Sequence, residues 1–299
     1  MIKTIRTDAS GIRLDAYLPS VLDNISRSYV RRLIDDGRVR INGTPAKPSY
    51  RVEPGLEVVV DLPDPRPDRA VPQSIPLHIV YEDEWILVVD KPQGMVVHPA
   101  PGHQEGTLVN ALLAYCGNQL SDLNGILRPG IVHRIDKDTS GLLLVVKDNR
   151  VHEKVAARIR RHEITRTYLA MVYGTMPAGE GTISAPIGRD PRNRKKMAVV
   201  QSGREATTHY RVLLAFRAAS WIECRLETGR THQIRVHLAS LGHPVVGDPV
   251  YAPGRKDYGL AGQALHAAVL EFDHPATGVR MRLEAELPAH LRSLLENMT

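Results

Sequence analysis

Hydrophobic and polar positions divide the chain into three stretches of different character. In residues 1–62, apolar residues recur at helical spacing in two segments and then alternate in short strand-like segments. Residues 63–75 are polar and rich in proline, a composition that predicts a semi-extended linker. From residue 76 onward, apolar runs of strand length dominate. The pattern predicts a small domain over 1–62, a linker over 63–75 and a larger domain over 76–299.

The larger stretch alternates between strand-like and helix-like segments. Continuous apolar runs predict strands at 85–90, 142–146, 168–174, 209–216, 221–226 and 283–287. Helical spacing predicts helices at 108–115, 151–162 and 289–298, and another that begins near residue 231. Residues 188–196 carry five basic groups and one acid. They predict either a solvated, disordered loop or a loop that contacts phosphates.

The densest cluster of reactive groups is residues 133–141, which directly precede the apolar run 142–146. A polar turn held by a rigid strand is a common setting for chemistry. Its central carboxylate, Asp136, lies between Arg134 and Lys137 in the sequence. A nearby cation keeps a carboxylate ionised, which suits a nucleophile or a general base.

Other chemistries fit this cluster less well. Asp136, Asp138 and Ser140 imitate the first half of a calcium loop, but the position that needs a bidentate acid is Lys147. Asp136 and Asp138 would lie about 7 Å apart on an extended segment, as in inverting glycosidases. Aromatic residues, which stack on sugars, make up only 5% of the chain, and a turn-forming role accounts for Asp138. Ser140 lacks the turn motif of serine hydrolases.

Metal and nucleotide motifs are missing from the sequence. The 13 histidines include no HExxH pair, and the two cysteines, Cys116 and Cys224, are far apart. We therefore expect buried free thiols and neither a zinc site nor a disulfide. The phosphate-binding and dinucleotide-binding glycine motifs are also missing. We expect no metal and no cofactor.

Composition and charge place limits on the partner and the compartment. The chain of 299 residues is 42% hydrophobic, which is ordinary for a globular protein, and no apolar run approaches the roughly 20 residues that span a bilayer. The N-terminus lacks the apolar core of a signal peptide, so we expect a cytoplasmic protein without a membrane partner. The net charge of +6 fits a polyanionic partner without identifying one.

Basic residues are concentrated in the small domain and in the polar segment near residue 190. These positions are either a solvated surface or contacts to an RNA backbone, and we favour RNA because the first group continues from a helix into a hairpin. The candidate RNA-binding residues are Arg27, Arg31, Arg32, Arg38, Arg40, Arg194, Lys195 and Lys196.

Residues 13–55 resemble the S4 RNA-binding domain. The similarity rests on Arg13-Leu14-Asp15 with Tyr17-Leu18, on Ser26-Arg27-Ser28, on the segment 37–43 and on Pro54-Gly55. The resemblance implies a structured RNA as partner.

Residues 78–275 resemble the RluA family of pseudouridine synthases. Residues 133–144 are similar to its HRLDxxTSGLLL signature, with Ile135 in place of the usual leucine, a volume-conserving change. Further motifs follow the family's order, at 91–98, 166–174, 229–251 and 265–267. Segments 97–102 and 106–113 resemble the RluD branch in particular, which modifies the helix 69 stem-loop of large-subunit (23S) ribosomal RNA.

The resemblance implies an isomerase that converts uridine to pseudouridine without metal or nucleotide cofactor. It implies that Asp136 is the essential carboxylate, either nucleophile or base, and that Arg230 pairs with it. It implies that Tyr168 stacks on the flipped base and that Arg134 enters the RNA. The alternatives are the same activity on another rRNA or tRNA site, or a non-catalytic role in RNA binding and ribosome assembly.

The fold implied by the resemblance is α+β. It consists of a catalytic domain with a central mixed, mainly antiparallel β-sheet and flanking helices, and a small N-terminal S4-like α/β domain. We expect a monomer whose partner is ribosomal RNA. The target uridine, the preference for free rRNA or an assembled subunit, and the orientation of the S4 domain are left open by the sequence.

Overall fold

The computed structural model describes residues 1–22, 25–62, 70–100, 102–125, 127–177, 179–193 and 196–298. The chain divides into two compact units, Met1–Asp68 and Arg69–Thr299, and each is treated separately below. No helix within these described ranges is both long enough and apolar enough to cross a membrane.

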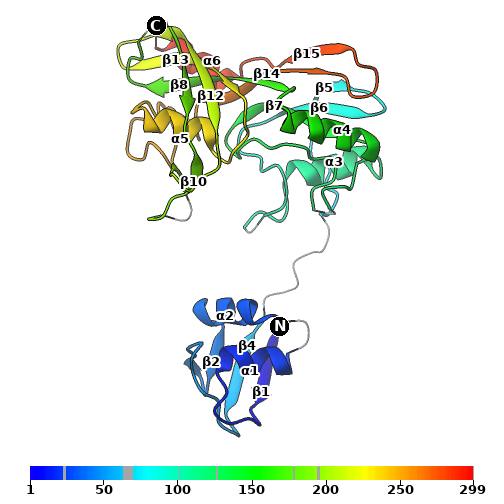
Figure 1. Cartoon of the computed structure of the whole chain (residues 1–299), viewed down its shortest axis with the longest axis vertical. Helices are drawn as coiled ribbons and strands as arrows, with labels where there is room; N and C mark the ends of the chain where they lie inside the picture. Colours follow the sequence, from blue (N-terminus) through cyan, green and yellow to red (C-terminus); the bar gives the residue numbers. More distant parts are fainter. Residues whose placement is uncertain are drawn as a thin grey trace. The chain divides into compact units, whose positions relative to one another are not determined.

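The smaller unit is a sheet covered by two helices (Figure 1). Its strands follow the order β1 (Ile2–Arg6), β4 (Glu57–Asp61), β2 (Val39–Ile41) and β3 (Thr44–Pro45), and all neighbours are antiparallel. The helices are α1 (Leu14–Val21) and α2 (Arg27–Asp35). The Ser26 side chain accepts a hydrogen bond from the Tyr29 N–H and caps α2 as predicted. Leucines and valines of both helices and of strands β2 and β4 form a core of their own.

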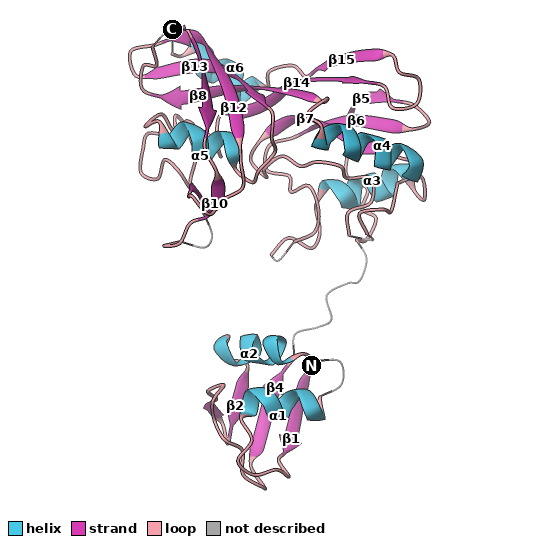
Figure 2. Cartoon of the chain, in the orientation of Figure 1, coloured by secondary structure: helices cyan, strands magenta, loops and turns pink. Residues whose placement is uncertain are grey.

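The larger unit is built, in its described part, on a nine-stranded mixed sheet (Figure 2). The strand order is β5 (His78–Glu82), β6 (Ile86–Lys91), β7 (Ser140–Val146), β14 (Leu265–Asp273), β8 (Thr165–Tyr173), β13 (Ala219–Leu226), β12 (Thr207–Ala215) and β9 (Glu180–Ser184), and β15 (Arg280–Glu284) pairs with β14. Only the β7–β14 pair is parallel. The prediction of a mixed, mainly antiparallel sheet is confirmed.

The parallel pair requires a glycine where β7 begins. Gly141 has φ +108°, and a Cβ at this position would lie 2.2 Å from the carbonyl oxygen of Ala267 on β14. Only a residue without a side chain lets the two backbones approach this closely. The close approach fixes the start of β7, directly after the cluster that contains Asp136.

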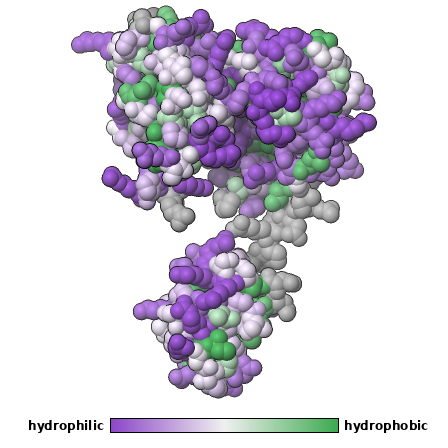
Figure 3. Space-filling view, in the orientation of Figure 1, coloured by the Kyte–Doolittle hydropathy of each residue, from purple (hydrophilic) through white to green (hydrophobic). Residues whose placement is uncertain are grey.

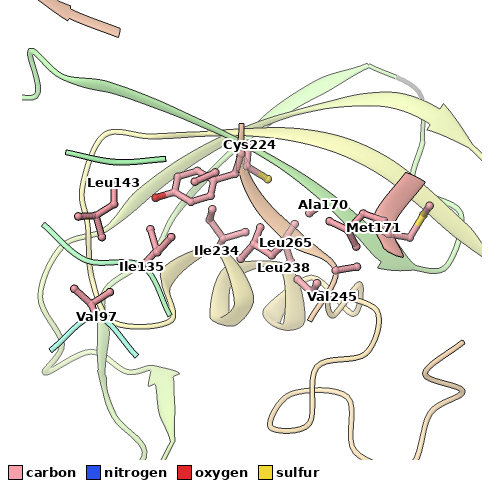
Figure 4. Packing of buried hydrophobic residues seen from close by; sticks show 14 of the residues in the cluster. Val97, Ile135, Leu143, Ala170, Met171, Cys224, Ile234, Leu238, Val245 and Leu265 are labelled. Carbon is pink, nitrogen blue, oxygen red and sulfur yellow. The ribbon is translucent and has the colours of Figure 1, made fainter. Parts of the chain in front are cut away.

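Helices cover both faces of the sheet. Alternate residues of β6 and β7 point to opposite faces, and one set packs against α3 (Leu108–Cys116) while the other packs against α4 (Asn149–Arg160). The helix α5 (Gln233–Ser240) directs Ile234 and Leu238 toward Leu265 and Cys224 of the sheet (Figure 4). The terminal helix α6 (Ala289–Glu296) packs its leucines into the same core. Cys116 and Cys224 are buried free thiols, as predicted.

Two segments differ from the expectation of irregular structure. In the polar segment 188–196, residues 188 and 189 belong to β10 (Ile187–Arg189), which pairs antiparallel with β11 (Met197–Val199). The Asp190 carboxylate accepts hydrogen bonds from the backbone N–H groups of Arg192 and Asn193. Of the predicted linker, residues 63–69 lie outside the described residues. Residues 70–75 belong to the larger unit and pack on α3, where the Gln73 N–H donates to the Asn110 carbonyl oxygen and the Asn110 side-chain amide donates to the Val71 carbonyl oxygen.

Candidate active site

Asp136 lies on a tight loop that leads into β7. The loop is closed by a hydrogen bond of 3.2 Å from the Thr139 N–H to the Asp136 carbonyl oxygen. All seven residues of β7 are buried, so the loop is anchored to the centre of the sheet. The Asp136 side chain retains 16% exposure. A carboxylate in this position is held by a rigid strand and is still accessible to a substrate.

A buried lysine fastens this loop to the turn that follows β6. Lys91 has no exposed surface, and its ammonium donates to the carbonyl oxygens of Pro92, Met95 and Lys137 at 2.7, 2.9 and 3.0 Å. Burial lowers the pKa of Lys91 to about 7, although the charges of Asp138 and Asp136 act in the opposite direction. The Gly94 N–H also donates to the Lys137 carbonyl oxygen at 2.9 Å. The turn and the Asp136 loop are therefore joined at one point.

The cation that pairs with Asp136 is Arg235, from α5. Its Nη1 lies 2.8 Å from Asp136 Oδ2, while its Nε and Nη2 donate to the two oxygens of Asp248 at 2.6 and 2.9 Å. Arg235 is 5% exposed and the Asp248 side chain is fully buried. Burial on its own lowers the pKa of Arg235, but the hydrogen bonds and charges of Asp248 and Asp136 raise it. Asp248 thus fixes the guanidinium that orients Asp136.

The expected pairing of Arg230 with Asp136 is wrong. Arg230 precedes α5, and its Nε donates to the Glu205 carbonyl oxygen at 3.0 Å. Between the two arginines, His232 adopts a left-handed conformation with φ 56° and turns the chain. This turn places Arg235, and not Arg230, against the carboxylate. Arg230 still lines the cleft that contains Asp136.

Tyr168 reaches the same cleft from β8. Its side chain is 5% exposed and is packed in the main core, and burial raises the pKa of its hydroxyl. Tyr168 therefore offers an uncharged aromatic ring near Asp136. A flat apolar surface beside a fixed carboxylate suits a planar ligand such as a nucleobase.

Asp136 lies where two hollows meet. One is lined by Tyr168 and by residues 229–235, and the other by residues 96–98 and by the loop 136–138. Arg134 is exposed and lines both. Figure 3 shows this face hollowed between the part that carries α5 and the part that carries α3 and α4. The first hollow is partly open to solvent, so a ligand can enter it from outside.

The predicted RNA-binding residues differ in whether their side chains already form ion pairs or hydrogen bonds within the chain. The five predicted arginines of the smaller unit are all exposed, but Arg27 pairs with Asp15 and Arg38 pairs with Asp61. Arg194 and Lys195 lie outside the described residues. Lys196 is described, and its ammonium donates to the Val250 carbonyl oxygen at 2.7 Å. Contact of these residues with RNA stays a prediction.

Arg235 was not predicted as a site residue, although its position on the helix gives one indication of its role. Arg235 lies between buried Ile234 and Val236 on a helix whose first six residues are all buried. A buried arginine is usually paired with a carboxylate. The partners Asp136 and Asp248 could not be chosen from spacing alone, because Asp136 is 99 residues away along the chain. No group of three or more possible metal ligands occurs among the described residues.

Two family models match the chain. The model described as RNA pseudouridylate synthase matches residues 85–240, and the model of the S4 domain matches residues 12–58.

Curated relatives match almost the whole length. An uncharacterized RNA pseudouridine synthase, YlyB, of Bacillus subtilis is 49% identical over 99% of this chain and 97% of its own. Ribosomal large subunit pseudouridine synthase D of Zymomonas mobilis is 47% identical over 98% and 96% of the two chains. The protein of the same name from Escherichia coli is 42% identical over 99% and 93%.

Solved structures match the larger unit. Human RNA Pseudouridylate Synthase Domain Containing 1 is 25% identical with a TM-score of 0.57, over 76% of this chain and 96% of that chain. Human RNA Pseudouridylate Synthase Domain Containing 4 shares the fold, with a TM-score of 0.58 over 74% of this chain and 92% of that chain.

Proposed function

The chain belongs to the RNA pseudouridylate synthase family and is an isomerase that acts on RNA, and from this premise we propose that it modifies large-subunit (23S) ribosomal RNA at the helix 69 stem-loop. The observation that carries the substrate is the similarity, over nearly the whole chain, to relatives named ribosomal large subunit pseudouridine synthase D. The S4 domain supports a structured RNA as partner. A ribosomal RNA substrate also supports a cytoplasmic location.

The reaction requires a flipped uridine. Its N1–C1′ bond must break and a C5–C1′ bond must form, and this rearrangement has no room inside a base stack. Arg134, exposed at the mouth of both hollows, is placed to occupy the space that the flipped base leaves. Arg230 lies on the cleft wall, where it can contact the flipped nucleotide.

Asp136 acts on the sugar, as nucleophile at C1′ or as base toward a sugar proton. Arg235 holds the carboxylate in one orientation before the substrate arrives, and such preorganisation is a large part of catalysis. Tyr168 supplies the ring on which uracil stacks.

The test is a map of pseudouridines in rRNA from cells with and without the gene. We expect pseudouridine in helix 69 to disappear without the gene, to return with the wild type, and not to return with Asp136→Asn. Asp138→Asn is the matched control, because it makes the same change two residues away in the same turn. An unchanged map contradicts the proposal, and a loss at another rRNA or tRNA site contradicts the helix 69 assignment. Normal ribosome assembly with Asp136→Asn would reveal an additional non-catalytic role.

A further inference from the structure

A second buried arginine, Arg166, lines the cleft without a partner. It lies on β8 two residues before Tyr168, so both side chains point to the same face, about 7 Å apart along the strand. Arg166 is 7% exposed, and its Nε is buried without a hydrogen bond. Across the part of the chain that the structure describes, no hydrogen bond or ion pair engages this guanidinium.

The two cleft arginines differ in charge balance. Arg235 is neutralised by the carboxylates of Asp136 and Asp248, whereas no carboxylate of a described residue contacts Arg166. An unpaired buried cation is costly to the free protein, since no counter-ion offsets its lost hydration. An unpaired buried cation of this kind indicates a site where a ligand supplies the missing partner.

The position of Arg166 is fixed by a glycine. A Cβ added to Gly229 would lie 2.8 Å from Arg166 Nη1, so the backbone before α5 rests against the guanidinium. The backbone of residue 229 is not in a left-handed conformation. A glycine is therefore needed here only because the Arg166 guanidinium lies so close to the backbone. The absent side chain of Gly229 leaves space for Arg166, which lines the same hollow as Tyr168.

We infer that Arg166 binds a carbonyl oxygen of the flipped uracil and stabilises the negative charge that this base carries while it is detached from the sugar. The inference rests on the proposed function and extends it to a further catalytic residue. The base is the part of a flipped nucleotide that enters deepest, and Arg166 lies in the wall beside the ring of Tyr168. A backbone phosphate stays near the RNA surface, where Arg134 and Arg230 are more accessible.

The step balances whether Asp136 acts as nucleophile or as base. When the N1–C1′ bond breaks, its electron pair leaves with uracil and spreads over N1 and the two carbonyl oxygens. Arg166 donates hydrogen bonds to one of these oxygens and keeps its proton. Meanwhile C1′ is either bonded to Asp136 as an ester, or the sugar has given a proton to Asp136. As C5 bonds to C1′, the ester bond breaks or the proton returns to the sugar. C5 then loses its proton and N1 gains one, so that pseudouridine forms without a redox agent. A fixed guanidinium in a buried site stabilises such a transient anion strongly.

The experiment compares Arg166→Met and Arg166→Lys with the wild-type full-length chain on rRNA transcripts. Single-turnover rates are measured with uridine and with 5-fluorouridine, whose fluorine stabilises the anionic base without the enzyme. We expect Arg166→Met to slow glycosidic cleavage of uridine by about 10²-fold and that of 5-fluorouridine much less, with RNA affinity unchanged. The rate of Arg166→Lys should lie between those of the wild type and Arg166→Met. Arg160→Met, on the exposed surface of α4, is the matched control.

Stability provides an independent readout. Because Met removes an unpaired buried charge and keeps much of the volume, Arg166→Met should raise the Tm of the free enzyme. A lower Tm, an equal rate loss with both RNAs, or a loss confined to RNA affinity would each overturn the inference. A wild-type chain that forms no pseudouridine on rRNA would instead contradict the proposed substrate, so the two failures are distinguishable.

Discussion

Arg235 binds two carboxylates at once, through three different nitrogen atoms. Two bind the buried Asp248 and one reaches the partly exposed Asp136. This division keeps the guanidinium in place when Asp136 engages a substrate. A lysine supplies one compact charge and cannot reproduce the three directed bonds.

We expect Arg235→Met to lower the free energy of unfolding by about 3–5 kcal/mol and to abolish activity, because it leaves a buried carboxylate without a cation. Arg235→Lys should fold and lose at least about tenfold in rate. Urea unfolding and single-turnover assays measure both effects. Arg230→Met should change the unfolding free energy by about 1 kcal/mol or less, since Arg230 donates to one carbonyl oxygen. Equal destabilisation by the two Met variants would contradict the assignment of Arg235.

At the scale of elements, local patterns predicted the long periodic segments and missed those set by distant contacts. The helix expected at 108–115 and the strand at 142–146 are confirmed as α3 and β7. Strand β14 was not predicted, because it is buried on both faces and lacks alternation, and its pairing with β7 and β8 arises only in the folded sheet. The closing strand predicted at 283–287 is β15, which begins and ends earlier. The Asp136–Arg235 pair was not predicted for the same reason, because tertiary contacts determine which distant residues pair.

Strand β7 is also held by a neutral histidine. The Leu144 N–H donates to His133 Nε2 at 3.0 Å, and burial, together with the charge of Arg166, lowers the pKa of His133 to about 3. The folded-state pKa is below the ordinary value of 6.5, so this contribution to stability is complete above pH 6.5 and is lost as the pH falls toward 3. His98, whose pKa burial lowers to about 4, adds to the same trend.

We expect the wild type to lose about 2 kcal/mol of unfolding free energy through His133 between pH 6.5 and pH 5. In His133→Gln, the amide oxygen can still accept from Leu144, but the group no longer titrates. Urea unfolding at pH 7 and pH 5 should therefore show a smaller difference for the variant. Identical pH dependence in the two proteins would show that His133 does not titrate on unfolding.

At the scale of the whole molecule, the S4 domain and the larger domain are built as separate units. The core of the smaller unit shares no residue with the cores of the larger one. No ion pair or hydrogen bond to described residues engages the exposed side chains of Arg31 and Arg40. Their charges are therefore free to meet phosphates.

We expect the double variant Arg31→Gln, Arg40→Gln to weaken RNA binding and to lower the slope of log affinity against log salt by about 0.7–0.9 per lost phosphate contact. The single-turnover rate on saturating RNA should not change, because no catalytic group is altered. Arg280→Gln, on β15 and paired with Asp273, is the charge-matched control. A wild-type salt slope in the double variant would show that these arginines do not contact RNA.

The three hydrogen bonds of the Lys91 ammonium have a consequence for local unfolding. Since one ammonium joins the turn at 92–95 to the carbonyl oxygen of Lys137, neither segment can open alone without stranding a buried charge. In hydrogen–deuterium exchange, the amides of Gly94 and Thr139 should open as one unit, and Lys91→Met should accelerate both by a similar factor. Unrelated exchange rates at Gly94 and Thr139 would show that the two segments open independently. A residue that never meets the RNA thus sets the lifetime of the loop that presents Asp136.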